Sequence, residues 1–148
     1  MDTTFRKLTA SDIDTCLSIM MENYPREEDK HWQALIQTDL AEVVAQKYPS
    51  ECLLVLCEGI AVGFGCSIKN SESPAIYALT WINILPSYQG RGIGKALIRE
   101  LEKNIISQNK GRLTIMLQTD KPAFYTKLGY KTASMGNGKD VMSRKFSL

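Results

Sequence analysis

The apolar residues in the first third of the chain recur every three or four positions, which is the spacing of amphipathic helices. A short strand is expected first, at Thr3–Leu8. Thr9 then stands three residues before Asp12, as in a capping box at the start of a helix. The apolar face of that helix comprises Ile13, Leu17, Met20 and Met21. A second helix is expected from about residue 29 to residue 46, and its apolar stripe, predicted to pack into the core, consists of Trp32, Leu35, Ile36, Leu40, Val43 and Val44.

Past residue 49 the spacing changes to compact apolar runs, which favour strands. Two such runs, Cys52–Cys57 and Ile60–Ile68, flank the dipeptide Glu58-Gly59. A glycine at the second loop position supplies the positive φ that a tight hairpin requires, so a hairpin is predicted here. Asn70–Pro74 is expected to be a loop. Ala75–Leu85 is rich in β-branched and aromatic residues, and we expect it to form a central strand.

The rest of the chain alternates between helical and strand patterns. Helical spacing returns at Ile93–Ile106, and a short helix at Lys121–Leu128 is expected to end at Gly129. Strands are expected at Arg112–Leu117 and Asp140–Leu148. The fold class is therefore α/β or α+β, with a mixed, mostly antiparallel sheet. Since 148 residues suffice for one core and no linker-like segment divides them, residues 1–148 are predicted to form a single domain.

Composition narrows the class of protein. Eighteen Lys and Arg against sixteen Asp and Glu give a net charge of +2, which is too small to indicate a nucleic-acid partner. No apolar run is long enough for a membrane span, and the first residues lack the apolar segment of a secretory signal. With no CxxC pair and a single histidine, both a structural metal and a disulfide framework are disfavoured for the four cysteines, Cys16, Cys52, Cys57 and Cys66. We expect a cytoplasmic protein with buried free thiols.

The segment with the most chemical information is Gln89-Gly90-Arg91-Gly92-Ile93-Gly94-Lys95, between an expected strand and an expected helix. Its glycines let the main chain approach a ligand closely, and the N–H groups of a first helical turn have no partner within the helix. An anion such as a pyrophosphate fits there, with Arg91 and Lys95 as counter-charges. A Walker A loop is excluded because Gln89 replaces a required glycine and Ala96 follows the lysine, and a dinucleotide fingerprint fails as well. Taken alone, the glycines also fit a turn that merely starts a helix.

Two motifs together resemble a known family. The run Trp81–Leu97, an apolar strand followed by Gln-Gly-Arg-Gly-Ile-Gly and a helix, resembles the acetyl-CoA motif of the GNAT superfamily of N-acetyltransferases. A second family motif is matched by Ala123–Tyr130, and the order of elements before both motifs is also similar, so the resemblance covers nearly the whole chain. It implies a GNAT fold, whose mixed central sheet is splayed in the middle and flanked by helices, and it implies acetyl-CoA as co-substrate without a metal.

The resemblance also implies which residues form the site. Acetyl-pantetheine is expected between the central strand and the strand after the glycine helix, paired with main-chain groups of Ile82, Asn83 and Ile84. The amide near Ile84 is expected to stabilise the tetrahedral oxyanion. The pyrophosphate is expected on Gln89, Gly90, Arg91, Gly92, Ile93, Gly94 and Lys95. Gln118, where relatives often carry Asn, is expected to offer an amide to pantetheine. Tyr125 is expected to protonate the departing thiolate, the alternative being a packing role.

The match is incomplete where many relatives carry the general base. Ala78 occupies the position of that carboxylate on the central strand. Deprotonation of the amine is then expected through water and main-chain carbonyls or through an acid of another element, the candidates being Glu22, Glu27, Glu28 and Asp29. His31 is expected at the surface rather than as the base. Tyr77 and Trp81 either line the acceptor pocket or fill the sheet.

The predicted function is transfer of acetyl from acetyl-CoA to a primary amine of an unidentified small molecule or peptide, by direct attack in a ternary complex. None of the cysteines falls in the motifs, so nothing indicates an acetyl-enzyme. The alternative is a CoA-binding sensor or partner-binding module without turnover, which the missing strand carboxylate favours and Tyr125 disfavours. Propionyl- or succinyl-CoA is a further candidate donor. Homodimers are frequent among relatives, but no sequence feature here establishes one.

Overall fold

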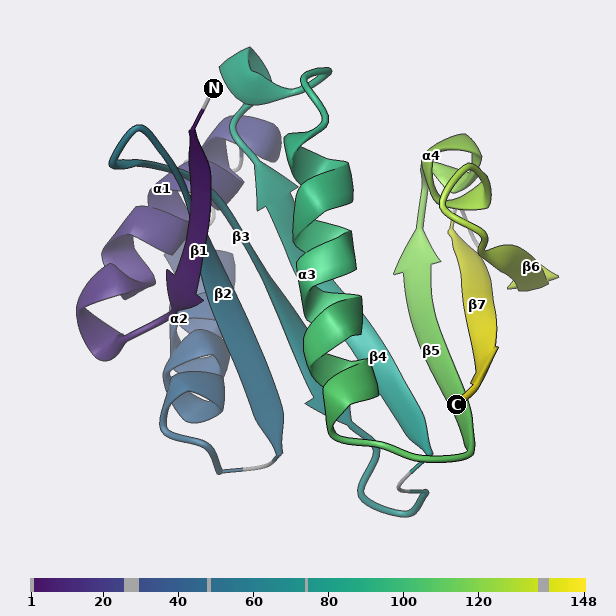
Figure 1. Ribbon diagram of the computed structural model, residues 1–148. Helices are drawn as coiled ribbons and strands as arrows, with labels where there is room; N and C mark the ends of the chain where they lie inside the picture. The colour runs from purple at the N-terminus through teal and green to yellow at the C-terminus, as the bar shows by residue number, and fades with distance from the viewer. Residues whose placement is uncertain (1, 26–29, 48, 74, 136–138) are drawn as a thin grey trace.

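A computed structural model describes residues 2–25, 30–47, 49–73, 75–135 and 139–148. Seven strands form one sheet in the order β1-β2-β3-β4-β5-β7-β6 (Figure 1). The strands are β1 (Thr3–Lys7), β2 (Ser50–Cys57), β3 (Ile60–Lys69), β4 (Ile76–Ile84), β5 (Arg112–Thr119), β6 (Lys131–Met135) and β7 (Asp140–Ser147). The α-helices are α1 (Ile13–Asn23), α2 (Lys30–Val44), α3 (Ile93–Ser107) and α4 (Pro122–Thr126), and short 3₁₀ turns lie at Ala10–Asp12 and Pro86–Tyr88.

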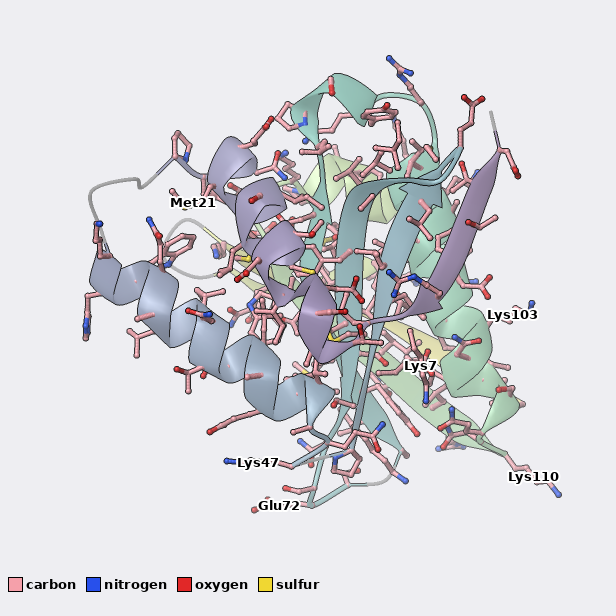
Figure 2. The ribbon with its side chains drawn as sticks, turned by 90° about the vertical axis from the view of Figure 1, so that its left-hand side faces the viewer. Lys7, Met21, Lys47, Glu72, Lys103 and Lys110 are labelled. Carbon is pink, nitrogen blue, oxygen red and sulfur yellow. A yellow bond between two sulfur atoms is a disulfide. The ribbon has the colours of Figure 1, made fainter. Side chains whose placement is uncertain are left out.

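Helices cover both faces of the sheet. Figure 2 shows α1, which carries the labelled Met21, and α2 on one face, with α3 and its Lys103 on the other. The inward residues of β2 divide accordingly, since Leu53 and Val55 pack with α3 whereas Leu54 packs with α1 and α2. A strand buried on both faces explains why β2 reads as an uninterrupted apolar run rather than an alternating one. Within the described ranges, no helix is both long and apolar enough to cross a membrane.

The sheet opens in its middle. Among the described strands, β4 and β5 form the only parallel pair, and their register covers three residue pairs that end at Ala78 opposite Met116. Beyond that point β4 continues to Ile84 and β5 to Thr119 without pairing to each other. Figure 1 shows the two strands close together at the lower end and apart at the upper end. The predicted fold class is thus confirmed, as a mostly antiparallel mixed sheet that is splayed in the middle and flanked by helices.

Two local predictions in the first half of the chain, the capping box at Thr9 and the hairpin at Glu58-Gly59, are confirmed. The Thr9 N–H donates to Asp12 Oδ2 at 2.8 Å, as the capping box predicts, and Arg6 adds two charged hydrogen bonds to the same carboxylate at 2.8 Å each. These bonds hold the pKa of Asp12 well below its ordinary value. The hairpin at Glu58-Gly59 is also confirmed, with φ values of 49° and 82°.

Three expectations need correction. The expected free thiols of Cys52 and Cys66 are wrong: the register of β2 and β3 sets these residues directly opposite each other, and they form a disulfide with 4.1 Å between their Cα atoms. Cys16 and Cys57 are free and buried, as expected. Leu35 is 52% exposed, because α2 meets the core through the narrower face of Leu40 and Val43. Strand β6 was not expected, since this exposed edge strand lacks alternating apolar residues and is set by pairing with β7.

Candidate functional site

A bulge in β4 shapes the open part of the sheet. Phe64 of β3 pairs with Asn83, but Cys66 pairs with Thr80, so two residues of β4 stand opposite Gly65. One of them, Trp81, has a φ of 54°, which is a costly conformation for a residue with a large side chain. A β-bulge bends its strand and redirects the side chains after it. The second half of β4, which contains the predicted residues Ile82, Asn83 and Ile84, therefore leaves the regular pleat where β5 departs.

Glycines on β3 make this bulge sterically feasible. A Cβ added to Gly65 would lie 2.7 Å from the side chain of Ile82 and 3.0 Å from that of Leu97. A Cβ added to Gly63 would lie 2.6 Å from the carbonyl oxygen of Asn83. All three distances are below ordinary van der Waals contact, so a side chain at Gly63 would push the β4 backbone away from β3, and one at Gly65 would displace the side chains of Ile82 and Leu97. The sequence contains this signal as Gly-Phe-Gly, but its meaning depends on the register of a partner strand.

The glycine loop lies at the upper end of β4 and starts α3. Gly90 and Gly92 have φ values of 77° and 81°, and a Cβ on either would meet nothing within 4 Å. The glycines are thus required by the backbone conformation and not by crowding, and the space around the loop is open. Ile93 is buried in the core, whereas Arg91 and Lys95 are exposed, with the Arg91 guanidinium 5.1 Å from the ring centre of Tyr88. Successive N–H groups in such a turn form a concave site for an anion.

The helix α4, which follows β5, places Tyr125 on the other side of the gap. Its ring packs edge to face against Phe124 and Tyr130, with ring centres 4.9 and 5.9 Å away. Burial, with smaller contributions from Tyr24 and Asp120, raises the pKa of Tyr125 to about 12. No described residue hydrogen-bonds to its hydroxyl, and no buried side-chain oxygen or nitrogen within the described ranges lacks a partner. The hydroxyl is therefore protonated and reaches accessible space instead of being sealed in the core.

A buried ion network holds the two sides of the gap together, although β4 and β5 share only three pairs. Glu102 of α3 is 4% exposed and accepts hydrogen bonds from Tyr130 at 2.8 Å, from Arg99 at 2.7 Å and from Arg144 of β7 at 3.3 Å. Both arginines also donate to the Leu128 carbonyl at 3.2 Å. Burial, together with the negative charge of Glu102, raises the pKa of Tyr130. The network ties α3 to the segment that follows α4, and so fixes where Tyr125 stands relative to β4.

A polar cluster at the end of α1 has no counterpart among the residues predicted from the sequence. The side-chain amide of Asn23 donates to Asn83 Oδ1 at 3.1 Å and to the Ile84 carbonyl at 3.0 Å. Gln89, expected beside the anion, donates its amide to Asn23 Oδ1 at 3.0 Å and to the Ile84 carbonyl at 2.9 Å. Asn23 belongs to no recognisable motif, and its partners lie about sixty residues away in the chain. No local pattern in the sequence therefore indicates its position. Tyr24, which contributes to the raised pKa of Tyr125, follows Asn23 directly.

The remaining candidates fall in several places. Gln118 is exposed on β5 beyond the last pair with β4, and Ala78 stands in that last pair. Glu22 is exposed at the end of α1, and Glu27, Glu28 and Asp29 lie outside the described residues. His31 is exposed, as predicted.

The two aromatic candidates of β4 differ in their surroundings. Tyr77 is buried and accepts a hydrogen bond from Asn109, so it fills the sheet. Trp81 is partly buried and packs toward α1 and α2. Within the described ranges, no group of His, Cys, Asp and Glu residues could hold a metal ion.

Solved structures that superpose on this chain include acetyltransferases. The PaiA N-acetyltransferase of Thermoplasma acidophilum, determined in complex with coenzyme A, superposes with a TM-score of 0.83 at 19% identity and covers 99% of this chain and 100% of its own. An aminoglycoside 6′-acetyltransferase of type Ii gives a TM-score of 0.74 at 20% identity over 97% of this chain and 96% of its own. At these identities the likeness establishes the fold alone.

Sequence comparisons identify the family. A Yersinia pestis acetyltransferase is 40% identical over 55 residues, which are 35% of this chain and 39% of that protein. The histone acetyltransferase TAP1 of Glycine max is 33% identical over 69 residues, 46% of this chain and 30% of that protein. The matches thus span about a third of the length of these curated relatives. The model of the acetyltransferase (GNAT) domain matches residues 49–132, more than half of the chain, and the protein therefore belongs to the GNAT acetyltransferase family.

Proposed function

We propose that the protein transfers the acetyl group of acetyl-CoA to a primary amine of a small molecule or peptide, by direct attack in a ternary complex. The observation that carries this proposal is the open gap between β4 and β5, with the glycine loop after one strand and the Tyr125 hydroxyl after the other. Direct attack is favoured over an acetyl-cysteine intermediate, because the free thiols of Cys16 and Cys57 are buried and burial raises the pKa of Cys16 to about 12.

The residues present fit acetyl-CoA. Beyond its last pair with β5, we expect β4 to offer main-chain groups of Ile82, Asn83 and Ile84 to the amides of pantetheine, with the N–H as the group of Ile84 because its carbonyl accepts from Asn23 and Gln89. The open loop from Gly90 to Lys95 offers first-turn N–H groups and two cations to the pyrophosphate. Gln118, exposed on the facing strand beyond its last pair with β4, is the residue that we expect to contact pantetheine from the other side.

The chemistry requires little beyond this arrangement. The neutral amine attacks the thioester carbonyl, so that a carbon–nitrogen bond forms, and the oxyanion that develops is stabilised by the Ile84 N–H. The carbon–sulfur bond then breaks, and the electron pair leaves on sulfur. With a pKa of about 12, Tyr125 is a weaker acid than a thiol of about 8.5, so full proton transfer to the thiolate is uphill by roughly 5 kcal/mol. Tyr125 therefore acts mainly by donating a hydrogen bond to the departing sulfur, while the proton lost by the amine passes to water.

The distribution of charge supports an anionic cofactor and a cationic acceptor. Residues 1–90 contain six Lys and Arg and twelve Asp and Glu, for a net charge of −6. Residues 91–148 contain twelve and four, for a net charge of +8. The part that carries the glycine loop thus attracts a nucleotide, and the part that carries α1 and β4 attracts a positively charged amine. The aminoglycoside 6′-acetyltransferase of the same fold acts, by its name, on aminoglycosides.

A CoA-binding sensor without turnover is the second candidate, because β4 carries no carboxylate from Ile76 to Ile84. The two functions share the cofactor site and differ only in whether an amine is consumed. They are therefore separable by one assay.

The test is release of free thiol from acetyl-CoA in the presence of a panel of amines, for the wild type and Tyr125→Phe. The wild type is expected to turn over, and the variant to lose about a hundredfold in kcat with an unchanged Kd for CoA. Because the pKa of Tyr125 is about 12, its ionisation is expected to produce no alkaline loss of kcat below pH 10.

Tyr77→Phe is the matched control, since it removes another buried phenol hydroxyl, which accepts a hydrogen bond from Asn109 and takes no part in the Glu102 network. It is expected to lower stability and to leave kcat within a few-fold. CoA binding with no amine consumed by the wild type would support the sensor, and absence of CoA binding would overturn both functions.

A further inference from the structure

We infer that Asn23 is a positioning residue for acyl transfer, which orients the peptide groups at the end of β4 and connects the acceptor side of the gap to the cofactor loop. This inference rests on the proposed function. It starts from a cluster of three side-chain amides, those of Asn23, Asn83 and Gln89, which come from α1, β4 and the loop before α3.

The amide of Asn23 is carried by a rigid element. Asn23 is the last residue of α1, and the helix is anchored by the buried side chains of Cys16, Ile19 and Met20. The next N–H, that of Tyr24, closes the helix on the Met20 carbonyl at 2.8 Å. The position of the Asn23 side chain is thus set by the packing of α1 on the sheet.

The contacts of Asn23 fix the backbone around Ile84. The Ile84 carbonyl accepts hydrogen bonds from Asn23 and from Gln89, and the following N–H, that of Leu85, donates to the Val62 carbonyl at 2.8 Å. Both polar groups of that peptide are therefore hydrogen-bonded, the N–H to β3 and the carbonyl, on the opposite side, to Asn23 and Gln89. Asn83, 4% exposed, is held through its side chain by the same amide. Residues 83 and 84 are restrained from both sides, and the direction of the intervening Ile84 N–H is set with them.

Only an amide serves every partner in this cluster. Asn23 donates two hydrogen bonds through its nitrogen and accepts one from Gln89 through its oxygen. An ionised aspartate has no hydrogen to donate and would face two acceptor oxygens, while an apolar side chain would leave Oδ1 of the buried Asn83 without its donor. A residue needed only for docking α1 against the sheet could be apolar. The particular arrangement of donors and acceptor points to a role in orientation.

The experiment compares Asn23→Ala and Asn23→Asp with Asn104→Ala. Asn104 is the control because its amide also makes a long-range hydrogen bond, to Glu51 at 2.6 Å, but from α3 to β2. Asn23→Ala is expected to reduce kcat about ten- to a hundredfold, a part of the loss found when an oxyanion donor is removed outright, with little change in the KM for acetyl-CoA. Asn104→Ala is expected to keep both.

The pH dependence separates orientation from simple structural support. In Asn23→Asp only the protonated acid can donate to Ile84, so its kcat relative to wild type is expected to rise as the pH is lowered toward 5. A loss that is the same at every pH for both substitutions would overturn the inference. Joint substitution with Gln89→Ala is expected to cost less than the product of the single losses, because both amides act on one carbonyl.

A second readout is independent of turnover. Amide hydrogen exchange at Ile84 and Leu85 is expected to be at least tenfold faster in Asn23→Ala than in wild type or Asn104→Ala. Unchanged exchange, or turnover unchanged in Asn23→Ala by an active enzyme, would overturn this inference and leave the proposed function standing. A wild type that binds no CoA would instead contradict the proposed function, and the exchange measurement would still decide the role of Asn23.

Discussion

Residues 1–90 and residues 91–148 contribute to the same gap but differ in charge and in what their local sequence reveals. The first part is acidic, and its four strands pair antiparallel over long registers. The second part is basic, meets the first through three strand pairs and the packing of α3 on the sheet, and contains the end of the first motif and all of the second. The proposed cofactor site uses a short continuous loop, whose sequence can be recognised. The proposed acceptor side combines α1 and β4, which are distant in the chain, and has no such motif.

Substitution of the loop glycines tests the cofactor side of this comparison and has the largest expected effect. Gly92→Ala forces a residue with a Cβ into the left-handed region, at a cost of about 1–2 kcal/mol, and is expected to weaken CoA binding about 5- to 30-fold as the loop relaxes. Isothermal titration with CoA measures the change.

Gly111→Ala provides the matched control, because Gly111 has nearly the same φ, 80°, and equally open surroundings in the turn between α3 and β5. It carries the same backbone strain and is expected to leave the Kd for CoA unchanged. Equal weakening by both substitutions would mean that the glycine loop has no special part in binding.

A substitution in the capping network at the start of α1 tests the acidic part of the chain, residues 1–90, through the free energy of unfolding. Asp12 has a lowered pKa in the folded state, so its contribution to the free energy of unfolding is present above its ordinary pKa of 3.8 and is lost as the pH falls below it. Asp12→Asn is expected to cost about 1–2 kcal/mol at pH 7 and much less at pH 2.

Urea unfolding at both pH values measures this difference. Asp14→Asn, at an exposed position in the first turn of the same helix, is the control and is expected to change stability by a few tenths of a kcal/mol. A cost for Asp12→Asn that does not depend on pH would contradict the assigned ion pair with Arg6.

The smallest expected effect is the dependence of KM on ionic strength, which tests the basic and the acidic part of the chain together. Raising the ionic strength from about 0.05 to 0.5 M is expected to increase the KM for acetyl-CoA several-fold, since the exposed cations of the loop are screened. Lys95→Ala is expected to reduce that salt dependence, whereas Lys110→Ala, at the far end of α3, is expected to retain it. A cationic amine is expected to show the same trend in its own KM, and a neutral amine is not.

Prediction from sequence succeeded where a feature depends on neighbours in the chain. The capping box at Thr9 and Asp12, the hairpin at Gly59 and the glycine loop before α3 all follow from backbone preferences over a few residues. It failed where the cause lies in another strand. The disulfide between Cys52 and Cys66 and the edge strand β6 follow from register, which composition and spacing do not specify.

The sequence by itself determined the fold class and the place of the glycine loop, because hydrophobic period and turn chemistry are local properties. Only the tertiary structure decided how the gap is shaped. Glycine is needed at position 65 because the bulge of β4 lies directly opposite it. Asn23 bonds the Ile84 carbonyl because the packing of α1 on the sheet places its amide at the end of β4. Such contacts join residues about sixty positions apart, and their energies depend on distances that arise only when the sheet and its helices have assembled.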